Sequence, residues 1–195
     1  KSEGYSTDII TDKAIAWMKQ RNDAKPFLLC AQFKAPHTPR TPALKDMASY
    51  DGVTFPEPPT LFDNYATRQP FVADTWMKIS GMDGPGLNIG PTQEELAADP
   101  KKMPHFLEDM NAAQRAVWHK AYDPRNREYA RLKAAGKLNG KDGVRYAYQR
   151  YIADTVRCVD GLDANVGRIL AYLDESGLSK NTIVIYASDQ GFFTG

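Results

Sequence analysis

TIVIYASDQG, residues 182–191, is the stretch of sequence that decides the fold. Its first six residues are mostly β-branched, apolar or aromatic, which is typical of a buried strand. Asp189 and Gln190 follow almost at once, so we expect a carboxylate and an amide oxygen at the carboxyl end of a strand, where open α/β sheets bind ligands. Two adjacent hard oxygen donors suit Ca²⁺ or Mg²⁺ better than Zn²⁺. The alternative is a plain turn in which Asp189 caps the next segment.

A second predicted strand covers residues 26–33, PFLLCAQF, and leads into a loop that contains three prolines. The prolines exclude a helix and hold Lys34 and His37 in a stiff, extended loop. If both strand ends meet at one sheet edge, an imidazole and an ammonium lie beside the cation site. That group suits an anionic ester, because positive charge binds the anion and His37 protonates the leaving oxygen. Alternatively, Lys34 is a solvated lysine and His37 a loop histidine bonded to a carbonyl.

The strongest helical pattern covers residues 146–176, where apolar residues recur at spacings of three and four before Gly177. A second amphipathic helix is predicted over residues 7–21. The order helix, strand, long irregular segment, helix, strand predicts an α/β layered sandwich with a mainly parallel sheet. The irregular segment, residues 43–143, is predicted to be an insertion into one domain, with helices over residues 110–122 and 123–138 inside it.

Composition excludes several classes of function. The 195 residues are 42% hydrophobic and 25% charged, which is ordinary for a globular protein. A net charge of +1 gives no support to nucleic-acid or anionic-membrane binding, and no apolar run reaches membrane-spanning length. The chain opens on Lys1 rather than Met and stops at Gly195, directly after its best motif. We therefore expect it to be a section of a larger protein, called the parent protein below.

The sequence also predicts whether two cysteines and two arginines are buried or exposed. Cys30 lies in a predicted strand and Cys158 in a predicted helix, so both are expected to be buried thiols rather than a disulfide. Arg150 and Arg157 are one heptad apart on the long helix and are expected to form a solvated face.

Four segments of the chain carry a family resemblance: GYSTDIITDKAIAWMKQR (4–21), KPFLLCAQFKAPHTP (25–39), RYIADTVRCVDGLDANVGRILAYLDESGL (150–178) and NTIVIYASDQGFFTG (181–195). In this order and spacing the sequence resembles the formylglycine-dependent sulfatases of the alkaline-phosphatase superfamily. The resemblance spans nearly the whole chain and is loosest between about 56 and 143. It implies an alkaline-phosphatase-like α/β sandwich, with residues 1–195 forming part of one sulfatase catalytic domain.

The resemblance implies roles for four residues. Asp189 matches a calcium-ligating aspartate, and Gln190 occupies the adjacent ligand position. His37 matches the histidine that contacts the sulfate and protonates the leaving group, and Lys34 lies in the same motif. The implied cofactor is Ca²⁺, with Mg²⁺ possible, and the implied substrate is a small-molecule or oligosaccharide sulfate ester of a carbohydrate. Family members of this kind act in the periplasm, outside the cell or in lysosomes.

The sequence also departs from the family pattern. Sulfatases make formylglycine from the Cys or Ser of a Cys/Ser-x-Pro-x-Arg motif, and no such motif occurs here. The family's N-terminal pair of calcium-binding aspartates is missing too, so we expect the isolated chain to be inactive and the parent protein to supply both. Two alternatives stay open at this point. One is a phosphodiesterase or phosphonate-ester hydrolase of the same superfamily, and the other is a truncated, non-catalytic domain that binds an anion.

Overall fold

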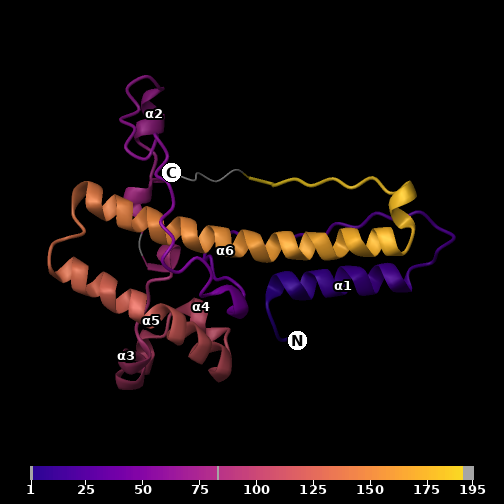
Figure 1. Ribbon diagram of the computed structural model, residues 1–195, viewed down its shortest axis with the longest axis horizontal. Helices are drawn as coiled ribbons and strands as arrows, with labels where there is room; N and C mark the ends of the chain where they lie inside the picture. The colour runs from indigo at the N-terminus through magenta and orange to yellow at the C-terminus, as the bar shows by residue number, and fades with distance from the viewer. Residues whose placement is uncertain (1, 83, 191–195) are drawn as a thin grey trace.

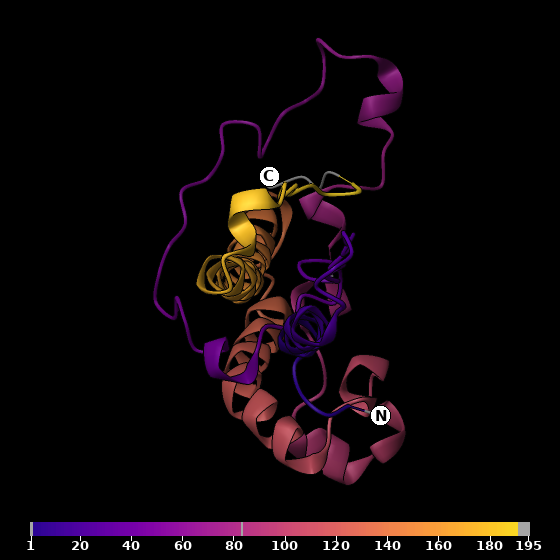
Figure 2. The ribbon, with the colours of Figure 1, turned by 90° about the vertical axis from the view of Figure 1, so that its right-hand side faces the viewer.

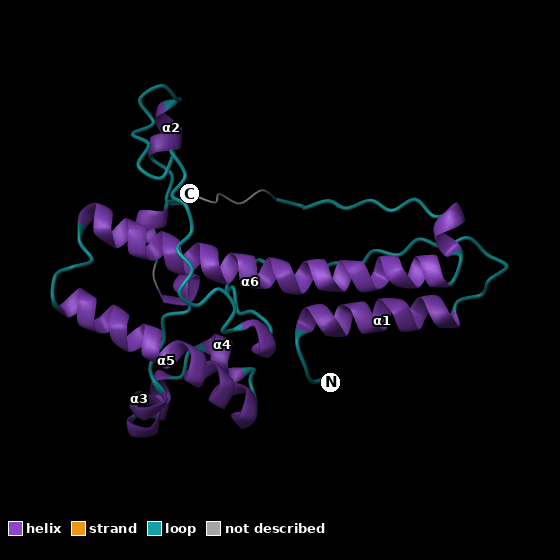
Figure 3. Ribbon diagram, viewed as in Figure 1, coloured by secondary structure: helices purple, strands orange, loops and turns teal. Residues whose placement is uncertain are grey.

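The computed structural model describes residues 2–82 and 84–190. Its longest helix, α6 (Gly140–Glu175), packs against α1 (Ser6–Gln20), and the two run in the same direction (Figure 1). Each helix is followed by an extended segment, residues 26–33 after α1 and residues 182–187 after α6, that runs back along the pair (Figures 1 and 3). Both predicted helices are confirmed, although α6 begins six residues earlier than expected, at Gly140 rather than residue 146.

Gly177 ends α6 as predicted. Its φ of 73° is left-handed, and its amide donates to the carbonyl of Asp174 at 3.0 Å, which satisfies one of the last free carbonyls of the helix. The chain can therefore reverse at once into the 3-10 helix η5 (Leu178–Asn181) and the extended segment that follows.

The predicted mainly parallel sheet is not confirmed, because the described residues contain no strand. Residues 26–33 and 182–187 are extended, but none of their side chains is buried. Residues 26–33 alternate between exposed and half-buried, with Leu28 86% exposed, and Ile183 in the second segment is 90% exposed. The expected burial of these two strands is therefore wrong for this structure. The physical reason is that a strand buries its faces and satisfies its backbone only by pairing with neighbours, and these two segments have none among the described residues.

Residues 43–143 fold into α5 (Ala112–Ala134) and a series of short helices. These are η1 (Leu44–Asp46), α2 (Pro70–Ala73), η2 (Ile79–Gly81), η3 (Gly84–Leu87), α3 (Gln93–Ala98), η4 (Pro100–Lys102) and α4 (His105–Glu108). The helices predicted over residues 110–122 and 123–138 are one continuous helix that contains Pro124. Asn111 caps it, accepting from the Gln114 amide at 2.9 Å. The segment around α2 projects away from the rest of the molecule as an arm (Figures 1 and 2).

Two apolar clusters organise this region: the first lies within residues 43–143, and the second packs the region against α6. One joins Met47 to α3, α4 and α5 around Trp118 and Tyr122, whose rings stack at 4.9 Å. The other packs Ile79 and Leu87 against α6 at Tyr148 and Tyr151 (further members are Ala147 in α6 and, partly buried, Phe55, Leu61 and Ile89). The N-terminal half of α6 is therefore covered by residues 43–143, while its C-terminal half packs against α1 (Figure 1). That residues 43–143 are an insertion into a single domain stays a prediction.

The contact between α1 and α6 is close at Gly161. A Cβ atom built at this glycine lies 3.5 Å from the ring of Tyr5 and 3.9 Å from an Asp46 carboxylate oxygen. Asn165 donates from its amide to the Asp8 carboxylate at 2.7 Å, one turn further along α6. Cys158 is buried beside this contact as predicted, whereas Cys30 is exposed, since the segment that carries it has no partner strand.

We predict that Gly161→Leu destabilises the fold and that Gly161→Ala does not. A methyl group fits at 3.5 Å, and alanine gains about 1 kcal/mol of helix propensity over glycine, whereas a leucine side chain must displace Tyr5 at a cost of about 1–3 kcal/mol. Urea denaturation followed by circular dichroism measures both. Gly167→Leu is the matched control, because a Cβ at Gly167 meets open space on the same helix. Equal midpoints for the two leucine variants would contradict the packing described.

We also predict that Cys158 makes the fold sensitive to alkali. Burial, and then the nearby Asp154 charge, raise the pKa of its thiol from 9.0 to about 12. The unfolded state therefore loses this proton from about pH 9 upward while the folded state keeps it. Stability must then fall as pH rises between these values, by up to about 1.4 kcal/mol per pH unit. Cys158→Ala should remove this part of the slope in unfolding experiments from pH 8 to about 11. Cys30→Ala, which removes the exposed thiol, is the control variant.

Candidate active-site loops

His37 lies at an exposed turn in the loop that follows residues 26–33. Its backbone amide donates to the Lys34 carbonyl at 2.8 Å, which closes the turn and places both side chains on one short segment. The ring atom Nδ1 lies 2.7 Å from the Thr38 carbonyl oxygen. Because a carbonyl only accepts, Nδ1 must carry the proton and Nε2 is the nitrogen left for proton transfer. The alternative of a loop histidine bonded to a carbonyl is thus observed, but it leaves the second nitrogen available for chemistry.

The inner end of this loop is held by Arg40. Its guanidinium lies over the Tyr151 ring, 4.6 Å from the centroid, and donates to the Thr38 hydroxyl oxygen at 3.1 Å. Burial lowers the pKa of Arg40 from its usual value, while the neighbouring Tyr151, Cys158 and Asp154 act in the opposite direction. The loop therefore has an exposed outer part that carries Lys34 and His37, and an inner end fixed on α6.

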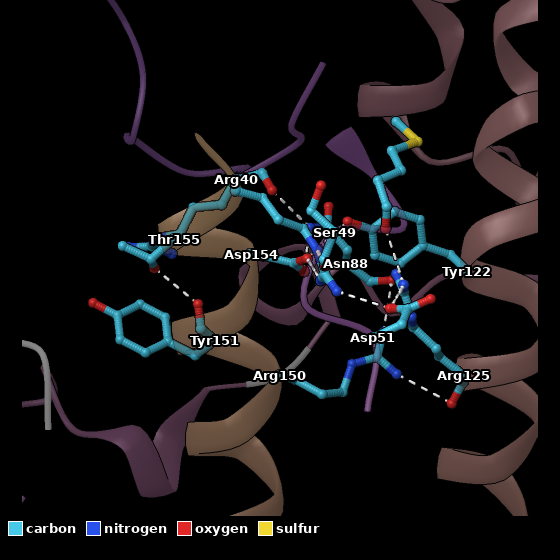
Figure 4. Close-up of polar contacts among 12 residues, drawn as sticks. Arg40, Ser49, Asp51, Asn88, Tyr122, Arg125, Arg150, Tyr151, Asp154 and Thr155 are labelled. Carbon is cyan, nitrogen blue, oxygen red and sulfur yellow. Dashed lines mark hydrogen bonds and ion pairs between the residues drawn. The ribbon is translucent and has the colours of Figure 1, made fainter. Parts of the chain in front are cut away.

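Asn88 links the loop to α6 (Figure 4). It is completely buried, with a left-handed φ of 49°, and its side-chain amide donates to the Arg40 carbonyl and to an Asp154 carboxylate oxygen, both at 2.8 Å. Its side-chain oxygen lies 3.4 Å from the Thr41 hydroxyl, which donates to it. Asn88 thereby contacts two neighbouring residues of the loop and one residue of the helix.

Asp154 is the buried centre of these contacts. Besides Asn88, it accepts from the Tyr122 hydroxyl at 2.8 Å and from Arg157 at 2.7 Å. Arg157 also donates to the Ser49 carbonyl at 2.6 Å and forms an ion pair with Asp51 at 2.9 Å. Burial, and then the Asp154 charge, raise the pKa of Tyr122 well above its usual 10.0, so its hydroxyl keeps the proton that it donates.

The expected solvated face formed by Arg150 and Arg157 is wrong. The Arg157 side chain is only 4% exposed, and Arg150 donates to the carbonyls of Arg125, Leu87 and Asn88 and to the Asn126 side chain (3.1, 3.0, 3.2 and 2.8 Å). The reason is that residues 43–143 cover this part of α6. The apolar periodicity of the helix does not indicate that another segment covers its charged residues. One signal was present: Tyr151, Asp154, Arg157 and Cys158 share the spacing of the buried stripe.

The second predicted loop begins at Ser188. Asp189 and Gln190 are exposed, and the Ser188 hydroxyl donates to the Gln190 carbonyl. Among the described residues, no hydrogen bond or ion pair joins them to Lys34 or His37. Both loops nevertheless follow extended segments that start where α1 and α6 end and run back in the same direction (Figures 1 and 3). The prediction that the two loops meet at one sheet edge requires this arrangement.

A carboxylate and an amide oxygen have the donor chemistry that Ca²⁺ prefers, so Asp189 and Gln190 fit such an ion, but they supply fewer than the roughly six to eight ligands that it takes. Over residues 2–82 and 84–190, no group of three or more His, Cys, Asp or Glu side chains is placed to bind a metal. Within the same residues, no helix is both long and apolar enough to cross a bilayer. Formylglycine has no position in this chain, because no Cys or Ser of the sequence lies in the required Cys/Ser-x-Pro-x-Arg motif.

Comparison with known proteins identifies the family. The family model named Sulfatase matches residues 1–194. The chain belongs to the sulfatase family. It is 37% identical, over 99% of its length, to an N-acetylglucosamine-6-O-sulfatase of Bacteroides thetaiotaomicron and covers 34% of that protein. It is 25% identical, over 93% of its length, to arylsulfatase K of Rattus norvegicus and covers 24% of it.

A solved structure, of a protein in complex with its substrate D-glucosamine-2-N,6-O-disulfate, superposes on 90% of this sulfatase chain with a TM-score of 0.81 at 34% identity. That superposition covers 35% of the solved chain. The sulfatase chain thus spans about a third or less of the length of the relatives that it matches. The match supports the alkaline-phosphatase-like fold class at the level of the family.

Proposed function

We propose that this chain forms the central section of a sulfuric-ester hydrolase that acts on a sulfated amino sugar. The observation that carries the proposal is the 37% identity, over 99% of the chain, to an N-acetylglucosamine-6-O-sulfatase. The solved relative with a glucosamine disulfate substrate supports the same class of substrate. In this reading the parent protein supplies the nucleophile motif and the remaining calcium ligands.

Each predicted site residue then has a chemical task. The Lys34 ammonium stabilises the negative charge of the sulfate. His37, when protonated at both ring nitrogens, donates the Nε2 proton to the leaving sugar oxygen and keeps the Nδ1 proton on the Thr38 carbonyl. Asp189 and Gln190 would hold Ca²⁺, which when bound supplies positive charge to the sulfate oxygens. No step is assigned to formylglycine, because no residue of this chain fits that group.

The proposal includes the mainly parallel sheet. Residues 26–33 and 182–187 are mostly apolar and extended, and none of their side chains is buried. They follow two parallel helices, as strands of an α/β sandwich do. We propose that further strands of the parent protein pair with both segments and bury their side chains. The loops that carry His37 and Asp189 would then leave the sheet at one edge.

We predict that His37→Ala in the parent protein lowers kcat for N-acetylglucosamine 6-sulfate by roughly 10²- to 10⁴-fold, because the leaving alcohol loses its proton donor. Circular dichroism should show an unchanged fold. His105→Ala is the control, since His105 is an exposed histidine that pairs with Glu108 in α4 and has no assigned task. A parental rate for His37→Ala would remove His37 from the mechanism. Turnover of a phosphate diester but not of the sulfate ester would favour the phosphodiesterase alternative.

We predict that Cys30 reacts readily with a maleimide in the chain of residues 1–195 and at least roughly tenfold more slowly in the native parent protein. The thiol is exposed here, and pairing of residues 26–33 within a sheet would bury it. Mass spectrometry of the labelled peptides measures both rates, with Cys30→Ser used to assign the label. Equal rates in the two proteins would argue against the proposed sheet.

A further inference from the structure

We propose that Asn88 is a positioning residue for His37, tethering the loop of residues 34–42 to Asp154 on α6. The inference rests on the proposed function, because it gives Asn88 a task only if His37 transfers a proton. Asn88 lies in the sequence about fifty residues after the loop, within the segment of residues 43–143, and belongs to neither predicted strand end.

The tether consists of two hydrogen bonds from one amide group. The Asn88 nitrogen donates one hydrogen to the Arg40 carbonyl and the other to Asp154, each at 2.8 Å. Since a primary amide has two hydrogens, both donors are used and the group has no alternative orientation of equal energy. Complete burial excludes water as a competing partner.

The helix side of the tether is rigid. Asp154 also accepts from Tyr122 and Arg157, so its carboxylate is held by α5 and α6 independently of Asn88 (Figure 4). The Asn88 carbonyl in turn accepts from Arg150 at 3.2 Å, which fixes the backbone at this left-handed residue. The Arg40 carbonyl is therefore attached to an anchor that does not move with the loop.

The loop side of the tether leads to the His37 ring. Arg40 donates to the Thr38 hydroxyl, and the Thr38 carbonyl accepts from His37 Nδ1. That last bond sets both the tautomer and the direction of Nε2. Without the hydrogen bond from Asn88 to the Arg40 carbonyl, Thr38 becomes more mobile. Its carbonyl oxygen then no longer fixes the orientation of the His37 ring and of Nε2. A misplacement of about 1 Å is enough to lower catalysis by roughly a hundredfold.

Asn88→Gly in the parent protein tests the proposal. Glycine adopts a φ of 49° without strain, so the change removes the tether and keeps the backbone. Asn165→Ala is the matched control, because Asn165 is also buried on α6 and its amide also joins a carboxylate, Asp8, to a carbonyl, Gly161. The hydrogen bonds of Asn165 among the described residues go to Asp8, Gly161 and Arg168, none of which belongs to the loop, and alanine suits its helical position.

The readout compares two leaving groups. N-acetylglucosamine 6-sulfate releases an alcohol that needs a proton, whereas para-nitrophenyl sulfate releases a phenolate that leaves without one. We expect Asn88→Gly to lower kcat for the sugar sulfate by roughly tenfold to a hundredfold and for the aryl sulfate by less than roughly threefold. Asn165→Ala, acting through stability alone, should change both rates by the same factor.

A double variant separates this inference from the proposed function. If Asn88 acts through His37, then His37→Ala combined with Asn88→Gly should be no slower on the sugar sulfate than His37→Ala alone. Full additivity, or an equal loss on both substrates for Asn88→Gly, would overturn the positioning role while leaving His37 as the proton donor. Normal activity of His37→Ala on both substrates would remove His37, and with it Asn88, from the mechanism. Absence of sulfate-ester turnover by the unaltered parent protein would instead overturn the proposed function itself.

Discussion

The Asp154 carboxylate, buried on α6, is the constraint on which the arrangement of the rest depends. A buried charge is stable only if its oxygens are satisfied, and three donors meet this demand: Tyr122 from α5, Arg157 from α6 itself and Asn88 from the segment that follows η3 and precedes α5. These contacts fix how residues 43–143 lie on the N-terminal half of the helix. The apolar clusters around Trp118 and Tyr151 add burial. The hydrogen bonds to Asp154, which are directional, specify the position of the segment along α6.

The helical part of the fold could be predicted from sequence because its signals are local. Apolar spacing identified α1 and α6, and Gly177 marked the end of α6. The two stretches predicted to be buried strands are extended, but they form no strand among the described residues and are not buried. Burial of a strand depends on partners elsewhere in space, which the composition of residues 26–33 or 182–187 does not reveal. Cys30 was mispredicted for the same reason.

The predicted site residues are easier to recognise in the sequence than the residues that anchor their loop. Lys34, His37, Asp189 and Gln190 stand out because they follow apolar runs at expected strand ends. Asn88 has no such signal: it lies in a Gly- and Pro-rich stretch where a left-handed residue is unremarkable. Arg157 was misread because a charged residue on a helix is usually solvated, and only the covering segment shows that this one is buried.

The anchoring of the His37 loop also bears on how a sulfatase combines specificity with catalysis. The segment that supplies Asn88 also forms the arm around α2, where Phe71 and Trp76 are exposed. Loops that select a substrate usually vary independently of the catalytic scaffold. Here the tether makes the segment part of the scaffold, because its amide holds the Arg40 carbonyl. If Asn88 acts as we propose, residues 43–143 cannot be exchanged as a free module, because a replacement must keep a donor at the position of Asn88 to hold the Arg40 carbonyl and the loop that carries His37.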